Sequence, residues 1–195
     1  MHPRVQEVLS ELDARRAHLH QTVANIPSSV RDARQVPSQW SVSETLEHLL
    51  LVEAPFERFI SLVWIPKVKA GALGVERRVG PVTRSLNRHY ADEPMSASER
   101  FAPHGDLVAA VVWERLEAVR QRLRESLLSA DGLAWGDAVV TYPGLGLKMN
   151  VYHWVLWLAN HEFRHTHEIE ALHRVVLREH AVLDPPRPRR WEGTR

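Results

Sequence analysis

Three histidines lie within seven residues in the segment "HEFRHTHEI", residues 161–169, directly after the apolar run "VYHWVLWLAN". On a helix that turns about 100° per residue, His161 and His165 point in the same direction, inside the apolar stripe. Two imidazoles at positions i and i+4 are close enough to bind one metal ion. The alternative is a pair of core histidines that donate to backbone carbonyls or to a nearby carboxylate.

A third histidine, His48, lies two turns into another helical pattern, at the flank of its apolar sector beside Val52 and Phe59. Helical bundles build metal sites from side chains on facing helices, and one histidine from one helix plus a pair from another suits this plan. Three neutral imidazoles would leave coordination positions open for water or substrate, as in a catalytic rather than a purely structural site. The predicted metal ligands are therefore His48, His161 and His165.

The letters "HEFRH" also match the H-E-x-x-H pattern of zinc metalloproteases, in which Glu162 would be the general base. Such proteases need a third ligand further along the chain and a sheet edge that aligns the peptide. The sequence predicts neither after His165. A solvated or ion-paired Glu162 is therefore the favoured interpretation, with Arg164 or another basic residue as its partner.

Four long amphipathic patterns position these residues, and no segment alternates convincingly with period two; "DAVVTYP" is the nearest. Ser41 and Glu44 form a capping box at the start of the second pattern, and Asp106 is the expected cap of the third. The predicted fold is all-α, a four-helix bundle with a long connection between the second and third helices. The expected helices span residues 3–26, 41–69, 106–130 and 150–180.

The composition bounds the function classes. The chain has 195 residues, of which 44% are hydrophobic and 25% are charged. It has no cysteine, which excludes disulfides and thiolate metal sites. Its net charge of +1 does not indicate nucleic-acid binding. We expect one domain over residues 1–183 and a disordered tail over residues 184–195, "DPPRPRRWEGTR". Neither a signal peptide nor a membrane span is recognisable, so a cytoplasmic protein that contacts neither nucleic acid nor membrane is expected.

Two segments together resemble the DinB-like (DinB/YfiT) superfamily of metal-binding four-helix-bundle proteins. "QWSVSETLEHLLLVE" resembles the W-S-x-x-E-x-x-x-H-L entry to that family's second helix. "YPGLGLKMNVYHWVLWLANHEFRHTHEIEAL" resembles its final segment, with a Pro-Gly turn and then H-x-x-x-H, and "RFAPHGD" before the third helix fits as well. Spacing and helix order agree over about residues 5–180.

By position, the resemblance places the family's histidine triad on His48, His161 and His165, with zinc, nickel or iron as the divalent metal, and it implies a homodimer. Family members with known activities include thiol-dependent S-transferases, which use bacillithiol, mycothiol or related thiols, and a thiol-dependent isomerase. One position departs from the family: Glu168 stands where Gln is frequent. Its carboxylate could bind the metal, orient a histidine, or act catalytically as a proton acceptor.

The resemblance implies a metal-dependent transferase that joins a low-molecular-weight thiol to an electrophilic small molecule. A metal-dependent hydrolase and a non-catalytic metal-binding or ligand-binding bundle are the alternatives.

The sequence also predicts where several residues outside the histidine set lie. Arg16 interrupts the first stripe; we expect it to extend to the bundle end, or else to pair with Glu168 or a substrate carboxylate. Three tryptophans are expected to lie in the core. Four arginines of the long connection are expected to lie in a solvated loop. Alternatively, that loop overhangs the metal and its arginines bind the carboxylates of a thiol. These residues are Trp40, Trp154 and Trp157, and Arg77, Arg78, Arg84 and Arg88.

Overall fold

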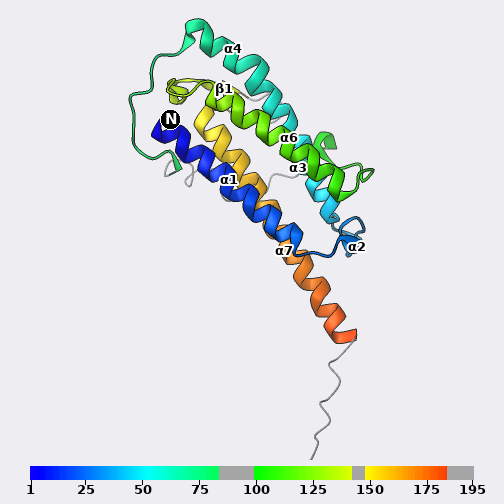
Figure 1. Ribbon diagram of the computed structural model, residues 1–195. Coiled ribbons are helices and arrows are strands. Elements are labelled where there is room, and N and C mark those ends of the chain that lie inside the picture. The colour runs from blue at the N-terminus through cyan, green and yellow to red at the C-terminus, as the bar shows by residue number, and fades with distance from the viewer. Residues whose placement is uncertain (84–98, 142–147, 184–195) are drawn as a thin grey trace, which may run out of the picture.

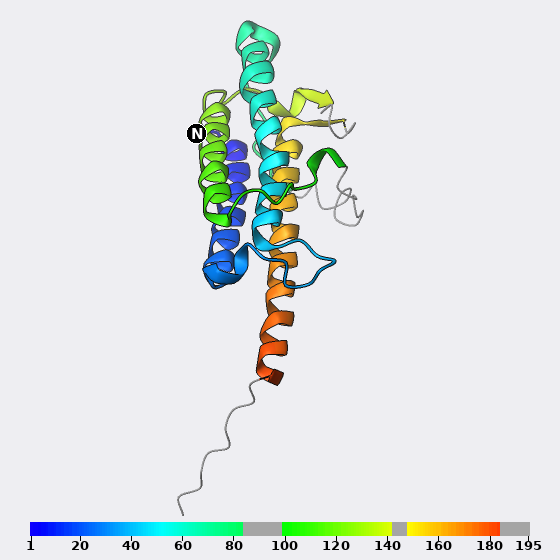
Figure 2. The same ribbon diagram turned by 90° about the vertical axis from the view of Figure 1, so that its right-hand side faces the viewer.

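The structure, a computed structural model, describes residues 1–83, 99–141 and 148–183. Within these ranges four main helices lie side by side (Figures 1 and 2), with the C-terminal part of the last helix extending beyond the others. α1 packs mainly against α7, and α3 mainly against α6, so the bundle consists of two helix pairs. The main helices are α1 (Pro3–Ala24), α3 (Val42–Phe59), α6 (Ala109–Leu128) and α7 (Val151–Leu183). The predicted bundle is confirmed.

Shorter elements connect the main helices. After α3 the chain stays helical as far as Ala72, through two π-helical turns and one short α-helix, close to the predicted end of this helix at residue 69. The segment "DAVVTYP" contributes one of two short antiparallel strands, in which Val140 lies opposite Met149. The connecting elements are α2 (Ser28–Arg31), η1 (Ile60–Trp64), α4 (Ile65–Lys67), η2 (Val68–Ala72), η3 (Glu99–Phe101), η4 (Trp135–Asp137), β1 (Val139–Thr141) and β2 (Lys148–Asn150).

Helix caps fix where two of the main helices begin. The predicted capping box at α3 is present: the Glu44 amide donates to Ser41 Oγ at 3.1 Å, and the Ser41 amide donates to Glu44 Oε2 at 2.8 Å. Asp106 does not cap α6, so that prediction was wrong. The first amide of α6, that of Ala109, donates to Asp32 Oδ1 at 2.7 Å. The cap comes from a residue far away in sequence, which local pattern does not reveal.

A polar layer divides the apolar core into two halves. One half lies towards the start of α1 and includes Leu12, Phe56, Leu123 and Leu158. The other lies towards the end of α1 and includes Leu19, Leu49, Leu116 and Ile169. Between these halves, every main helix contributes one buried charged residue. The four residues are Arg16, Glu53, Arg120 and Glu162, and we call them the charge cluster.

Each arginine of the charge cluster binds both carboxylates. Arg16 Nη2 lies 2.8 Å from Glu53 Oε2 and 2.8 Å from Glu162 Oε2. Arg120 donates through Nε to Glu53 Oε1 at 2.6 Å and through Nη2 to Glu162 Oε2 at 2.7 Å. Burial raises the pKa of the Glu53 carboxyl, but Arg120 and Arg16 more than reverse this, so the pKa lies below its usual value. The cluster is therefore a set of ion pairs that links all four helices.

Arg16 does not extend to the bundle end, and it does not pair with Glu168. Its exposed fraction is 6%, because its position in the middle of α1 faces the carboxylates of the other three helices. The third of these carboxylates belongs to Glu117 of α6, 3.0 Å from Arg16 Nη1, and its side chain is 49% exposed. The predictions that Arg16 extends to the bundle end or pairs with Glu168 were therefore wrong.

In residues 1–83, 99–141 and 148–183, no helix is both long enough and apolar enough to cross a membrane.

Glu53→Gln should lower the free energy of unfolding by about 3–5 kcal/mol, because it leaves the two buried arginines of the charge cluster to share the single carboxylate of Glu162, with one buried positive charge uncompensated. The matched control is Glu117→Gln, which removes a half-exposed partner of the same Arg16 and should cost about 0–1 kcal/mol. Urea unfolding of both variants measures the difference. Equal losses would contradict the structural role assigned to the charge cluster.

The decrease in the free energy of unfolding caused by Glu53→Gln should depend on pH. The folded-state pKa of Glu53 is depressed, so its contribution is fully present above the unfolded value of about 4.3 and is lost as pH falls through the folded value. The difference in the free energy of unfolding between wild type and Glu53→Gln should therefore become smaller as the pH is lowered. Urea unfolding of both proteins in a series of buffers of decreasing pH measures it.

Candidate metal centre

The three histidines predicted from the sequence meet in the middle of the bundle. His161 Nε2 lies 3.2 Å from His48 Nε2 and 3.2 Å from His165 Nε2. All three rings are buried, and one ligand atom from each lies within 4.8 Å of the others. The structure therefore brings one histidine of α3 and two of α7 into a cluster that could bind a metal ion.

In two of the rings, the hydrogen bond made by Nδ1 determines which ring nitrogen carries the proton, and therefore whether Nε2 faces the centre of the cluster as an acceptor. His48 Nδ1 lies 2.7 Å from the carbonyl oxygen of Phe101, and His165 Nδ1 lies 2.7 Å from Glu168 Oε2. Because a carbonyl and a carboxylate only accept, the ring proton of each histidine is on Nδ1. Both Nε2 atoms therefore present a lone pair to the centre of the cluster.

The third ring, that of His161, is held differently. Its plane stacks on Trp157, with 5.2 Å between ring centroids and 16° between planes. Among the described residues, its buried Nδ1 has no hydrogen-bond partner. The ring is thus oriented by aromatic packing and by its helix rather than by an outer hydrogen bond.

The donor set fits a divalent cation. Two nitrogens bound to one tetrahedral ion at about 2.1 Å would lie about 3.4 Å apart, close to the 3.2 Å that separates His161 Nε2 from the Nε2 atoms of His48 and His165. Without an ion, the lone pairs of His48 and His165 both face His161, which can donate one proton at most from Nε2. A cation would be bound by all three lone pairs at once.

The surroundings favour neutral imidazoles, the form that binds metal. Burial lowers the pKa of His48, with His165 and Arg164 adding to the effect and the Phe101 carbonyl opposing it. Burial lowers the pKa of His161 well below its usual value, and the neighbouring histidines and Arg164 lower it further. At neutral pH these two rings are therefore uncharged and available to a cation.

Glu168 contacts the outer nitrogen of His165 and not the centre of the cluster. Burial raises the pKa of its carboxyl, but the hydrogen bond from His165 and the charge of Arg164 leave it below its usual value. An ionised carboxylate on the far side of a metal-binding imidazole fixes its tautomer and orientation. Of the roles open to Glu168, this arrangement corresponds to orienting a histidine.

Glu162 is ion-paired, as the favoured interpretation of "HEFRH" had it. Its partners are Arg16 and Arg120 in the charge cluster rather than Arg164, and its exposed fraction is 2%. A carboxylate engaged by two buried guanidiniums is not placed as a protease general base. It instead ties the helix turn of His161 to the charge cluster.

A hollow of about 400 Å³ adjoins the histidine cluster. Two of its lining residues contact the cluster: the Trp40 ring lies 5.0 Å from that of His48, and Glu168 binds His165. Trp154 and Trp157 are buried as predicted, whereas Trp40 is half-buried and lines the hollow. The full lining is Ser38, Gln39, Trp40, Thr45, Glu168, Ile169, Ala171 and Leu172.

The arginines of the long connection are not at the cluster, as far as they are described. Arg78 pairs with Glu76 and Asp137, and Arg77 is exposed. Arg84 and Arg88 lie outside the described residues. Within the described part of the chain, Arg164 is a basic side chain in contact with the histidines: its Nη2 lies 3.5 Å from His165 Nε2. Its place directly before His165 in the sequence was a signal for this contact, whereas the sequence-based interpretation gave Arg164 only as a partner for Glu162.

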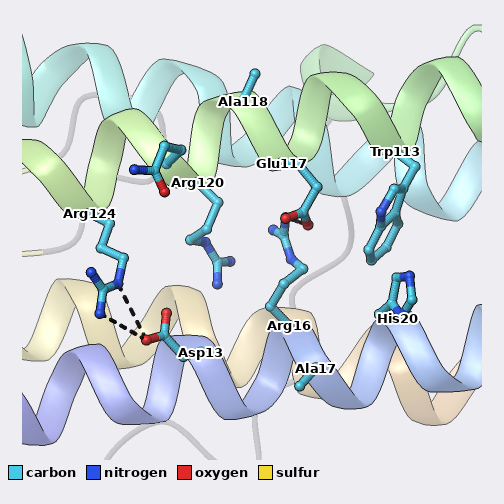
Figure 3. A pocket seen from close by; sticks show the side chains of 10 residues that line it. Asp13, Arg16, Ala17, His20, Trp113, Glu117, Ala118, Arg120 and Arg124 are labelled. Atoms are coloured by element: carbon cyan, nitrogen blue, oxygen red, sulfur yellow. Dashed lines mark hydrogen bonds and ion pairs between the residues drawn. The ribbon is translucent and has the colours of Figure 1, made fainter.

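A second hollow, of about 840 Å³, lies between α1 and α6 (Figure 3). Its charged side chains are paired across the two helices, Arg16 with Glu117 and Arg124 with Asp13. None of the three histidines lines either hollow, but the hollow beside Trp40 is lined by two residues that contact them, Trp40 and Glu168, whereas the residues lining the hollow between α1 and α6 include neither. The hollow beside Trp40 is therefore the one relevant to metal chemistry.

Comparison with known proteins bears on the same residues. The family model of the DinB superfamily matches residues 11–169, which include all three histidines of the cluster. No curated protein and no solved structure matches the chain.

Protein purified without added metal should contain about one divalent ion per chain, or take one up, as measured by elemental analysis and by titration. His48→Ala and His161→Ala should each reduce metal affinity by more than the about 10–100-fold typical of losing an outer hydrogen-bond partner. His173→Ala, on the same helix but outside the cluster, is the control. Unchanged metal affinity and metal-dependent stability in both cluster variants would contradict the site.

Glu168→Ala should weaken metal affinity by about 10–100-fold, since His165 loses the group that fixes its ring. Glu168→Gln, which keeps an acceptor oxygen at the same place, should lose less. Competition with a chromophoric chelator measures both. If Glu168→Ala bound metal as tightly as wild type, the hydrogen bond to His165 would have no orienting role.

Proposed function

The chain is a member of the DinB superfamily, and on that footing we propose that it is a metal-dependent S-transferase, which joins a low-molecular-weight thiol to an electrophilic small molecule. The observation that carries the proposal is the buried three-histidine cluster beside a hollow large enough for a small ligand. His48, His161 and His165 would hold zinc, nickel or iron through their Nε2 atoms.

The reaction needs a thiolate at neutral pH. When bound, the cation would supply a coordination position at which a thiol loses its proton readily. The carboxylate of Glu168 is ionised and 55% exposed; because it lies on the outer nitrogen of His165 and not at the centre of the cluster, it would take that proton through an intervening water. The sulfur then forms a bond to the electrophilic carbon, and the leaving group departs with the bonding electron pair and takes up the proton.

The hollow beside the cluster supports a small-molecule substrate. Its walls combine apolar surface from Trp40, Ile169 and Leu172 with polar groups such as Thr45, a composition typical of ligand sites. The aromatic face of Trp40 lies between the hollow and His48, so an electrophile packed on it would lie close to the cluster.

A hydrolase would use the same open position for a hydroxide in place of a thiolate. The histidine cluster alone does not choose between these nucleophiles. A direct measurement of thiol binding distinguishes the transferase from the hydrolase.

Cobalt-loaded protein should develop a thiolate-to-metal absorption band with at least one of bacillithiol, mycothiol and glutathione, and should form a thioether from that thiol and an activated aryl chloride. His161→Ala should lose both signals, while His173→Ala keeps them, because only the first removes a ligand. Absence of both band and turnover with all three thiols would refute the transferase; ester or amide hydrolysis by the same preparation would then favour the hydrolase.

A further inference from the structure

Arg164 lies against the inner side of the histidine cluster. Its Nη2 is 3.5 Å from His165 Nε2, the nitrogen that faces His48 and His161. Its only carboxylate neighbour within the described residues is Glu168, at 3.9 Å from Nε, a distance too long for a hydrogen bond. Among those residues, the buried Nε has no hydrogen-bond partner. The guanidinium therefore keeps donors available beside the cluster.

This placement is unfavourable once a cation is bound. A guanidinium within a few ångströms of a divalent ion is repelled by it, and the nearby carboxylate of Glu168 is turned to the outer nitrogen of His165. The repulsion disappears when an anion lies between the two positive groups. An arginine fork binds a carboxylate or another oxyanion through two parallel hydrogen bonds.

The side chain of Arg164 is accessible from outside. It is 41% exposed, and it stands on the same face of α7 as Glu168, which is 55% exposed and lines the hollow beside Trp40. Arg164 and His165 do not line this hollow, but both lie within 4 Å of Glu168, which does, so a ligand bound against Glu168 would lie beside them. None of the arginines expected from the long connection has such a position in the described residues.

We propose that Arg164 binds the carboxylate of a thiol whose sulfur occupies the open metal position, so that the site selects carboxylate-bearing thiols. The proposal rests on the proposed function, which it deepens by naming the substrate's anionic group. Arg164 is thus a specificity residue, a role for which the described arginines of the long connection, Arg77 and Arg78, are not placed.

Cobalt-loaded protein is titrated with 3-mercaptopropionate and with its neutral amide, and the thiolate-to-cobalt band gives both dissociation constants. Wild type should bind the carboxylate about tenfold more tightly or better, and Arg164→Gln should remove most of that preference while leaving the amide within about twofold. Arg164→Lys should retain part of it. Arg174→Gln, an exposed arginine ten residues further along α7, is the matched control and should behave as wild type.

A second readout separates this role from a structural one. Without any thiol, Arg164→Gln should bind cobalt about threefold to tenfold more tightly than wild type, because a neighbouring positive charge is removed. A side chain that only supports the fold would weaken cobalt and anion binding together. Loss of both, or an unchanged preference for the carboxylate thiol, would overturn the proposal.

Failure of the proposed function gives a different result. If no thiol produces the band in wild type, the transferase is refuted, and acetate then tests Arg164 through its shift of the cobalt visible spectrum. Acetate should bind wild type more tightly than Arg164→Gln. Equal acetate binding by both would overturn the role of Arg164 as an anion-binding residue.

Discussion

The rest of the structure depends on four buried charges, one from each main helix. Arg16, Glu53, Arg120 and Glu162 form ion pairs at 2.6–2.8 Å between the two apolar halves of the core. Burying such charges is expensive, and replacing a complete set by apolar residues is often neutral or stabilising. Their value here is specificity: apolar stripes permit several registers between helices, whereas only one register brings two guanidiniums onto two carboxylates.

That register also positions the candidate metal centre. Glu162 follows His161 directly on α7, and Glu53 lies five residues after His48 on α3. Fixing the two carboxylates against the same arginines fixes the two helices that supply all three imidazoles. A shift of one turn in either helix, about 5.4 Å, would move the Nε2 atoms out of reach of a common ion. The charge cluster and the histidine cluster are thus neighbouring parts of one polar layer.

Local pattern predicts most of this, and it fails where contacts join distant segments. The four helices follow from apolar periodicity, the start of α3 from its capping box, and the histidine cluster from helical spacing together with the family resemblance. The partners of Arg16 could not be found in this way, because each of its carboxylates comes from another helix. The same holds for Asp32 at the start of α6 and for the Phe101 carbonyl that orients His48.

The three imidazoles are held with unequal firmness, and this bears on what the site can do. His48 and His165 are each fixed by an outer hydrogen bond, whereas His161 relies on its stack against Trp157. Stacking fixes the plane of a ring while leaving it some freedom to slide, so His161 is the ligand best able to adjust when the coordination number changes. Its neighbour Glu162 limits that adjustment to the side chain, because the charge cluster holds the backbone turn. A rigid frame with one adjustable ligand suits a cation that exchanges ligands at an open position more than one sealed in a structural site.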